Sequence, residues 1–302
     1  MTLITPLITI FSVIIFGIFC CRQQIFDDAQ IEGFELLLFK IIMPCYLFVS
    51  VYESKLSVLM NLKYIASYLI TFILMTLIVS AIFFRTKSII EICIRVLAAS
   101  YVNAAKYALP IITILFKDPL AGIIGNLVQV LIIQPIFILA LNLLSDNDNS
   151  VMSRIKGVIS TPLVFMPIIG VIVNYYHLKI PAAALDAIFQ ISSSASGLAL
   201  FSIGLTIGST PISKKLFKLD LISMVTLKNF VHPAIAAGVA TYMHLSTYWF
   251  NSLIIASAAP TAFVVYYLSK QFSAETATIK SEIFLSTVLS MIAFIIIALI
   301  LG

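Results

Sequence analysis

The sequence has little charge and lacks the motifs that mark the common hydrolases. Only 10% of its 302 residues are charged, whereas soluble domains are typically about a quarter charged. It contains no HExxH, no Gly-x-Ser-x-Gly and no pair of aspartates inside an apolar run. Metalloprotease, serine hydrolase and intramembrane aspartyl chemistry therefore have no candidate residues, and we expect neither enzyme activity nor a cofactor.

Cysteine is also scarce. The four cysteines are Cys20, Cys21, Cys45 and Cys93, all within or beside apolar segments, with no CxxC and no histidine at ligand spacing. Such residues are typical of buried, inert thiols. We therefore expect neither a disulfide framework nor a metal site.

What the sequence has in abundance is apolar side chains. Hydrophobic residues make up 61% of the chain, and its mean hydropathy is +1.13. One water-exposed globule cannot hide so many, which leaves lipid as the solvent. The net charge of +5 is spread singly or in small groups between apolar runs. This pattern suits loops at an anionic membrane surface and argues against a nucleic-acid partner.

Ten stretches are long and apolar enough to span a bilayer, which takes about 20 residues. They are 3–21, 33–52, 61–84, 92–115, 120–144, 155–177, 184–208, 219–243, 247–269 and 280–301. The first lacks a basic segment and a small-residue cleavage site before it ends, so we interpret it as a retained helix and not a signal peptide. The prediction is an all-α integral membrane protein with ten transmembrane helices.

Lys and Arg are distributed unevenly between the connections of these stretches. The odd-numbered connections and adjoining helix ends hold eleven: Arg22, Arg85, Lys87, Arg95, Arg154, Lys156, Lys214, Lys215, Lys218, Lys270 and Lys280. The even-numbered connections hold four: Lys55, Lys63, Lys117 and Lys179. Positive charge accumulates on the cytoplasmic side. We therefore expect the odd-numbered loops in the cytoplasm and both termini on the outer side.

A weak internal repeat divides the chain. Residues 4–17 and 160–170 share TPL, an apolar run and a glycine, at an offset of about 156 residues. Because five helices is an odd number, two such halves would have opposite orientations in the membrane. The sequence predicts a 5+5 inverted repeat, 1–144 and 153–302, joined by a short cytoplasmic linker at 145–152. Inverted repeats are common in secondary transporters, which bind substrate near the bilayer midplane.

The fourth and ninth stretches each contain a proline at mid-membrane. Pro110 follows Asn103 and Lys106, and Pro260 is followed by Thr261. Proline removes a backbone donor and clashes with the preceding turn. Each proline alone is compatible with a simple packing kink. As a pair in corresponding helices, they predict two broken helices, whose free backbone groups and half-helix N-termini favour an anion.

Cations outnumber acids inside the predicted spans. Lys106 and Lys228 lie within apolar stretches, and Lys40 is a third candidate. The nearby acids are predicted close to helix ends: Glu35, Glu91, Asp186, Asp220 and Glu282. An ammonium at bilayer depth is costly and should face a cavity or a partner, although Lys40 and Lys228 could also snorkel to an interface. The excess of cation suggests an anionic substrate.

Three further polar residues are candidates for a supporting or ion-binding role. Asn229 and His232 lie in the same apolar stretch as Lys228, and Gln129 lies in the fifth stretch. His232 titrates near neutral pH in its ordinary state. A lone membrane histidine is more often a hydrogen-bond partner between helices.

Four motifs together resemble the auxin efflux carrier family. They are SYVNAAKYALPI at 100–111, LKNFVHPAI at 227–235, MPCYLF at 43–48 and the segment 256–290 that begins ASAAPTAFVVYYLSK. The resemblance covers nearly the whole chain and is of the short prokaryotic type, since only SDNDNS stands where plant members insert a long loop. Two positions depart from the family's pattern. Lys106 stands where the family usually has an apolar or aromatic residue, and Ala108 stands where it commonly has a glycine.

The resemblance implies a bile-acid-symporter-like fold within the superfamily of bile acid, auxin and arsenite transporters. Helices 1, 2, 6 and 7 would form a scaffold, often dimeric, and helices 3–5 and 8–10 a moving transport domain. The two broken helices would cross at their prolines. Family members move organic anions, such as auxin in plants and malate or malonate in some bacteria. It also implies a location in the inner, or plasma, membrane of a prokaryote.

The sequence therefore predicts an alternating-access secondary transporter for a small organic anion, and we expect this anion to be a carboxylate. Substrate-binding candidates are Asn103, Lys106, Pro110, Lys228, Pro260 and Thr261, and Gln129, Asn229 and His232 are second candidates. Transport could couple to protons, sodium or the membrane potential. The alternatives are a sodium-coupled symporter of the bile-acid type, with ligands at Asn103, Gln129 and Thr261, and a membrane sensor that binds without flux. A channel is a weaker alternative, because the sequence shows no segment that would form the ring of a selectivity filter.

Overall fold

The structure is a computed structural model that describes residues 4–145, 156–157, 160–209 and 219–301. Apart from Ser145, the predicted linker 145–152 lies outside these residues, as do Arg154, Lys214, Lys215 and Lys218. The described residues form helices and their connections, with a single isolated antiparallel bridge between Val102 and Thr261. The all-helical prediction is therefore confirmed over the part of the chain that is described.

The first half of the chain forms helices in the order α1 to α9, with three π-helical turns labelled η. They are α1 (Ile4–Arg22), α2 (Asp28–Leu37), η1 (Leu38–Ile42), α3 (Met43–Tyr52), α4 (Leu56–Leu59), α5 (Leu62–Phe83), α6 (Ile89–Ser100), η2 (Ala104–Ala108), α7 (Leu109–Phe116), α8 (Leu120–Val128), η3 (Gln129–Ile133) and α9 (Gln134–Leu144).

The second half follows the same kind of order. It comprises α11 (Pro162–Tyr175), α12 (Ala182–Ser192), α13 (Ala195–Ser209), α14 (Leu219–Thr226), η5 (Leu227–Val231), α15 (His232–Tyr242), α16 (Thr247–Ala258), α17 (Val264–Gln271) and α18 (Thr276–Leu301).

Each π-helical turn stands directly before a proline. Pro44, Pro110, Pro135 and Pro233 each occupy the second position of the α-helix that follows such a turn. Proline has no N–H, and its ring clashes with the carbonyl four residues earlier. The wider π turn makes room for that ring while the helix continues. Pro110 therefore lies within a continuous helical segment and does not interrupt it.

Among the described residues, five helical segments are long and apolar enough to cross a membrane. They are Asp28–Tyr52, Ser57–Phe83, Leu120–Leu144, Ala182–Ser209 and Thr276–Ile297, and three shorter apolar helices are Pro6–Arg22, Ala104–Phe116 and Pro162–Tyr175. Large apolar side chains lie exposed along these segments, for example Ile15, Leu77 and Ile136. Since apolar surface of this extent requires lipid, the chain is an integral membrane protein.

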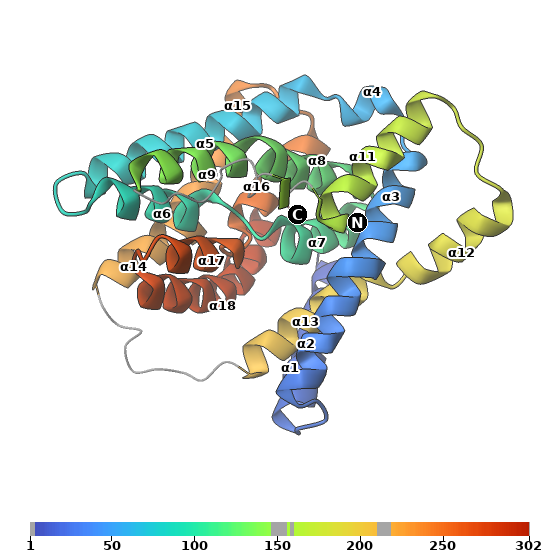
Figure 1. The fold of residues 1–302 in the computed structure, drawn as a ribbon, viewed down its shortest axis with the longest axis horizontal. Coiled ribbons are helices and arrows are strands. Elements are labelled where there is room, and N and C mark those ends of the chain that lie inside the picture. The colour runs from blue at the N-terminus through green and yellow to red at the C-terminus, as the bar shows by residue number, and fades with distance from the viewer. Residues whose placement is uncertain (1–3, 146–155, 158–159, 210–218, 302) are drawn as a thin grey trace.

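Figure 1 shows two groups of helices. One group, which lies on the left in this view, contains α5, α6, α9, α14, α17 and α18. The other group contains α1, α2 and α13 in the lower part of the view and α3, α11 and α12 on the right. The shorter α7 and α16 lie towards the centre, where the two groups meet. Helix α1 packs along α13, and α11 packs along α3.

Glycine makes the closest of these packings possible. A Cβ on Gly204 of α13 would lie 2.2 Å from the Ile14 carbonyl oxygen, and one on Gly17 of α1 would lie 2.4 Å from the Phe201 carbonyl oxygen. Small residues let helix backbones approach closely, which is how membrane helices gain van der Waals contact without a hydrophobic driving force. The α1–α13 pair is therefore held at backbone distance.

Candidate functional site

Two helices are interrupted, and the interruptions meet. Helix α6 ends at Ser100 and α16 ends at Ala258. After each of them the backbone continues without helical structure until η2 and α17, respectively, begin. The Asn103 N–H donates to the Pro260 carbonyl (2.7 Å), and the Ala262 N–H donates to the Tyr101 carbonyl (3.1 Å). We call residues 101–103 and 259–262 the crossover. Pro260 lies within it, whereas the first interruption lies at 101–103, not at Pro110, because the π turn accommodates that ring.

Gln129 completes the backbone hydrogen bonding of the first interruption. Its side-chain Oε1 accepts from the Val102 N–H (2.7 Å), and its Nε2 donates to the Val102 carbonyl (3.1 Å). The side chain is 1% exposed. An unpaired backbone group inside a membrane protein costs several kcal/mol. Gln129, predicted as a possible ion ligand, therefore has both ends of its amide engaged by one peptide unit.

The carbonyl ends of the two interrupted helices are also satisfied by side chains. Thr261 Oγ1 lies 2.5 Å from the Ala98 carbonyl oxygen, in the last turn of α6. Lys228 Nζ donates to the Ser257 carbonyl (2.8 Å), in the last turn of α16. A cation at a helix C-terminus is favoured by the helix dipole. Lys228 is fully buried, so the alternative that it snorkels to an interface is wrong.

The amino end of the segment after the first interruption is capped by Asn103. Its Oδ1 accepts from the Lys106 N–H (3.3 Å), as in a helix N-cap. The half-helix formed by η2 and α7 therefore begins at the crossover with its N-terminus beside Asn103 and Lys106. Such a terminus carries partial positive charge and attracts anions.

Lys106 has a partner that the sequence did not predict. Its ammonium forms an ion pair with Glu35 of α2 and donates to Thr206 Oγ1 of α13 (2.9 Å). Ser202 Oγ donates to the same Glu35 oxygen (3.0 Å), and Thr206 Oγ1 lies 3.0 Å from that oxygen and 2.9 Å from the Ser202 carbonyl oxygen. The expectation that acids lie away from the intramembrane cations is wrong here, because α2 begins at Asp28 and places Glu35 in its third turn.

The remaining predicted residues lie on the other side of the crossover. His232 Nδ1 lies 3.3 Å from Lys228 Nζ, and the Asn229 amide donates to the Ser286 carbonyl of α18 (3.0 Å). All three side chains are buried. Lys228, Asn229 and His232 therefore join η5 and α15 to the crossover helices rather than to the Lys106 ion pair.

Glu282 is a second acid whose position the sequence analysis did not find. It is fully buried on α18, with Oε1 2.8 Å from Thr261 Oγ1. Helix α18 begins at Thr276, so Glu282 is not at the helix end. A signal was present, since Glu282, Ser286 and Ser290 follow at intervals of four and form one polar stripe, each 0% exposed.

A cavity adjoins the crossover between α9, α11 and α17. Its volume is about 460 Å³, within the range of small-molecule sites, and its polar lining residues are Asn126, Gln134, Thr161 and Gln271. The Tyr101 hydroxyl donates to Gln134 Oε1 (2.8 Å). The cavity wall is therefore connected directly to the first interruption.

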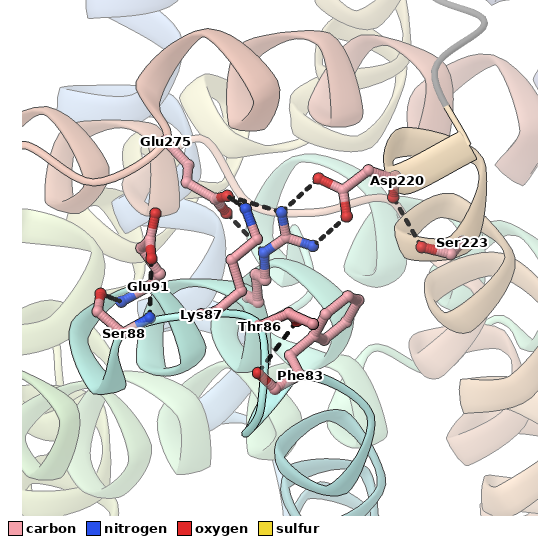
Figure 2. Close-up of polar contacts among 9 residues, drawn as sticks. Phe83, Thr86, Lys87, Ser88, Glu91, Asp220, Ser223 and Glu275 are labelled. Atoms are coloured by element: carbon pink, nitrogen blue, oxygen red, sulfur yellow. Dashed lines mark hydrogen bonds and ion pairs between the residues drawn. The ribbon is translucent and has the colours of Figure 1, made fainter.

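A cluster of charges lies apart from the crossover, around Arg95 in the middle of α6 and Lys87 in the α5–α6 connection. The Arg95 guanidinium contacts Asp220 of α14 through Nη1 and Nη2 (2.7 and 2.5 Å) and Glu275 through Nε and Nη2 (2.6 and 2.7 Å). Lys87 also pairs with Glu275 (2.5 Å). Figure 2 shows the side chains of Lys87, Asp220 and Glu275 converging from different segments. The Arg95 side chain is 0% exposed, and the cluster joins segments far apart in sequence.

Comparison with known proteins gives a consistent set of matches. Residues 149–298 match the model of a family described as membrane transport protein. Over 292 residues the chain is 26% identical to a protein of Escherichia coli K12 described as an uncharacterized transporter, YfdV, covering 91% of this chain and 90% of that relative. The proteins of that name in Escherichia coli O157:H7 and Shigella flexneri match to the same extent.

Proposed function

We propose that this chain, which belongs to the membrane transport protein family of the auxin efflux carriers, is a secondary active transporter for a small organic anion. The family match and the related transporters confirm the family predicted from the sequence motifs. They make the chain a multi-pass membrane transporter and agree with the absence of catalytic motifs. The anionic cargo and the alternating-access cycle are our proposal.

The proposed architecture is the 5+5 inverted repeat with a scaffold and a transport domain. It is supported by reciprocal packing: α1 of the first half lies on α13 of the second, and α11 of the second half lies on α3 of the first. One interrupted segment in each half, meeting at Val102 and Thr261, also supports it. In this proposal α1–α3 and α11–α13 form the scaffold, and the remaining helices form the transport domain.

The Lys106–Glu35 ion pair carries the functional proposal. It joins η2, beside the crossover, to α2 and α13, which belong to the other group of helices in Figure 1. The Lys106 side chain is 13% exposed and that of Glu35 is 34% exposed. Both side chains therefore keep some accessible surface, and in this proposal an anion approaches the ammonium from that side.

We propose that the carboxylate of the substrate replaces Glu35 as the partner of Lys106. Breaking a partly buried ion pair leaves a costly unpaired charge, so the empty transport domain stays attached to the scaffold. A bound anion satisfies Lys106 and releases Glu35, which retains Ser202 as a donor. The loaded transport domain is then free to move, and the N-terminus of the η2–α7 segment adds attraction for the anion.

The test is a thermal-shift screen of the purified protein against organic acids, including malonate and malate. A ligand of the native state raises Tm by mass action. We expect at least one acid to stabilise the wild type and to lose its effect on Lys106→Gln, and we expect Lys40→Gln, a change at an exposed lysine, to respond like the wild type. Retention of the shift in Lys106→Gln would refute the assignment. Flux of the same acid in proteoliposomes separates a transporter from a sensor.

Sodium coupling is the alternative within transport. It requires oxygen ligands at the crossover, but the Gln129 amide is engaged by Val102 and the Thr261 hydroxyl by Ala98 and Glu282. These contacts favour a sodium-independent carrier. Equal flux in sodium and choline media is the expected result.

The orientation and the assembly also belong to the proposal. We place the protein in the inner membrane of a prokaryote, with both termini on the outer side and the Arg95 cluster on the cytoplasmic side, and as a homodimer by family analogy. Labelling of single introduced cysteines by an impermeant reagent tests the orientation. Cross-linking in native membranes tests the dimer.

A further inference from the structure

Glu282 places a carboxyl group directly against the crossover. Its Oε1 lies 2.8 Å from Thr261 Oγ1, which lies in turn 2.5 Å from the Ala98 carbonyl oxygen. Both distances are those of O–H···O hydrogen bonds. Three oxygens thus stand in sequence, with the threonine hydroxyl between the other two, and all three residues are 0% exposed.

The number of protons in this row determines the state of Glu282. A threonine hydroxyl has one hydrogen and can donate only once. The Ala98 carbonyl can only accept, so each of the two contacts has a hydrogen of its own only when the carboxyl group carries a proton and donates it to Thr261 Oγ1. If Glu282 were ionised and took the Thr261 hydrogen, Thr261 Oγ1 and Ala98 O would face each other at 2.5 Å with lone pairs only.

We infer that Glu282 carries a proton in this conformation, and we propose that it is the proton-binding group of the transport cycle. The proposal rests on the transport function proposed above and adds a co-transported proton. The other carboxyl oxygen, Oε2, has no hydrogen-bond partner among the described residues. An ionised carboxylate with an unsatisfied oxygen in such a buried place would be strongly disfavoured, which agrees with the protonated form.

The charged surroundings of Glu282 explain how proton and anion are linked. Lys228 of η5 acts on it electrostatically, and His232 of α15 contacts Lys228. The acidic, basic and histidine groups on the other helices that pack against α18 are Glu91 and Arg95 of α6, Asp220 of α14, Lys270 of α17 and Arg22 at the end of α1. Glu91 is held by Ser88 at the start of α6. Arg95 and Asp220 neutralise each other, and Lys270 is exposed. Lys228 is therefore the charge that responds to Glu282.

Proton transfer changes the net charge of this buried pair. When Glu282 is protonated, the Lys228 charge is unbalanced, and an anion at the crossover is favoured. When the carboxyl O–H bond breaks, the proton passes to water, the carboxylate balances Lys228, and the anion is disfavoured. At the same time the Thr261 hydrogen turns from Ala98 to Glu282, which leaves the last turn of α6 without that cap. The proton and the organic anion therefore travel in the same direction.

The proposal is tested by infrared spectroscopy of the reconstituted protein during a pH titration, without any organic anion. A protonated carboxyl group has a C=O band distinct from that of a carboxylate. We expect such a band at neutral pH in the wild type and in Glu91→Gln, its loss in Glu282→Gln, and its shift in Thr261→Val, where the hydrogen bond is removed. Tm measurements confirm that each variant is folded. Absence of the band from the wild type, or its persistence in Glu282→Gln, would overturn the proposal.

Two further arms separate this inference from its rivals. If sodium chloride removes the band and choline chloride does not, the site binds sodium and the proton proposal fails. With malonate as the probe, we expect a larger rise in Tm at acidic than at alkaline pH in the wild type and a pH-independent rise in Glu282→Gln. A pH-independent rise in the wild type contradicts the coupling. Because the infrared readout uses no anion, a failed anion screen leaves the Glu282 result standing, and the reverse also holds.

Discussion

Replacing Arg95 with alanine should be among the most destabilising changes available outside the crossover. The guanidinium makes four hydrogen bonds to two carboxylates, from Asp220 and Glu275, and lies 4.4 Å from the centre of the Phe83 ring. Alanine removes all of these contacts at once. It also leaves two acids close together without the charge that held them there.

The magnitude follows from the exposure of each partner. Removing one member of a buried ion pair costs about 3–5 kcal/mol. The Asp220 side chain is 41% exposed and can regain water, whereas Glu275 is 8% exposed and keeps only Lys87. We therefore expect about 3–5 kcal/mol for Arg95→Ala. Asp220→Asn should cost less, about 1 kcal/mol, because its exposed contact is screened and Arg95 keeps Glu275.

Thermal unfolding in detergent measures the difference. A loss of this size should lower Tm by on the order of 10 °C. Arg85→Ala is the matched control, since Arg85 also stacks on a phenylalanine but is exposed, and it should unfold at nearly the wild-type temperature. If Arg95→Ala unfolds with Arg85→Ala, or if Asp220→Asn is as damaging as Arg95→Ala, the reasoning about the cluster is wrong.

Three other predictions concern separate parts of the fold. Gln129→Leu should lower the free energy of unfolding by about 2–4 kcal/mol, because the Val102 N–H and carbonyl both lose their partner. The Tm in detergent measures this loss, and an unchanged Tm would contradict the role of Gln129 in holding the Val102 peptide. Gly204→Ala should lower Tm by forcing α1 and α13 apart, whereas Gly197→Ala, where a Cβ meets nothing within 4 Å, should not. The hydrogen bond from the Ser88 N–H holds the pKa of the Glu91 carboxylate below its usual range. This carboxylate therefore stabilises the fold at pH values above that range and ceases to do so as pH falls through its lowered pKa. We expect the wild type to have a higher Tm than Glu91→Gln at neutral pH, and an advantage that persisted in acid would contradict this.

The helical membrane character of the chain could be predicted because it depends on the length and composition of apolar runs. The polar first turns of helices were harder to find. Helices α2 and α18 begin at Asp28 and Thr276, whereas the apolar stretches were placed from 33 and 280. Glu35 and Glu282 therefore looked like residues at helix ends. The capping box formed by Asp27 and Gln30 was a sequence signal for the true start of α2.

That the segments around Asn103 and Pro260 lie near one another could be predicted, whereas most of their contacts could not. Asn103, Pro260 and Thr261 do meet, but the partner of Lys106 lies 71 residues earlier in the chain, and no local pattern indicates such a pairing. The position of the first interruption could not be predicted either. A proline marks a position that lacks a backbone donor. The interruption occurs instead where Gln129, from another helix, can form hydrogen bonds with the exposed peptide of Val102.

The antiparallel contact at Val102 and Thr261 has a consequence for how such a protein can diversify. The two interruptions are joined to each other through N–H and carbonyl groups, which every residue except proline supplies in the same form. The contact between the two interruptions therefore does not depend on the identity of the side chains at Tyr101, Asn103 and Ala262, whereas the peptide of Val102 also needs Gln129. Side chains around the crossing point can change while the crossing point stays, so that new binding properties can arise without a new fold.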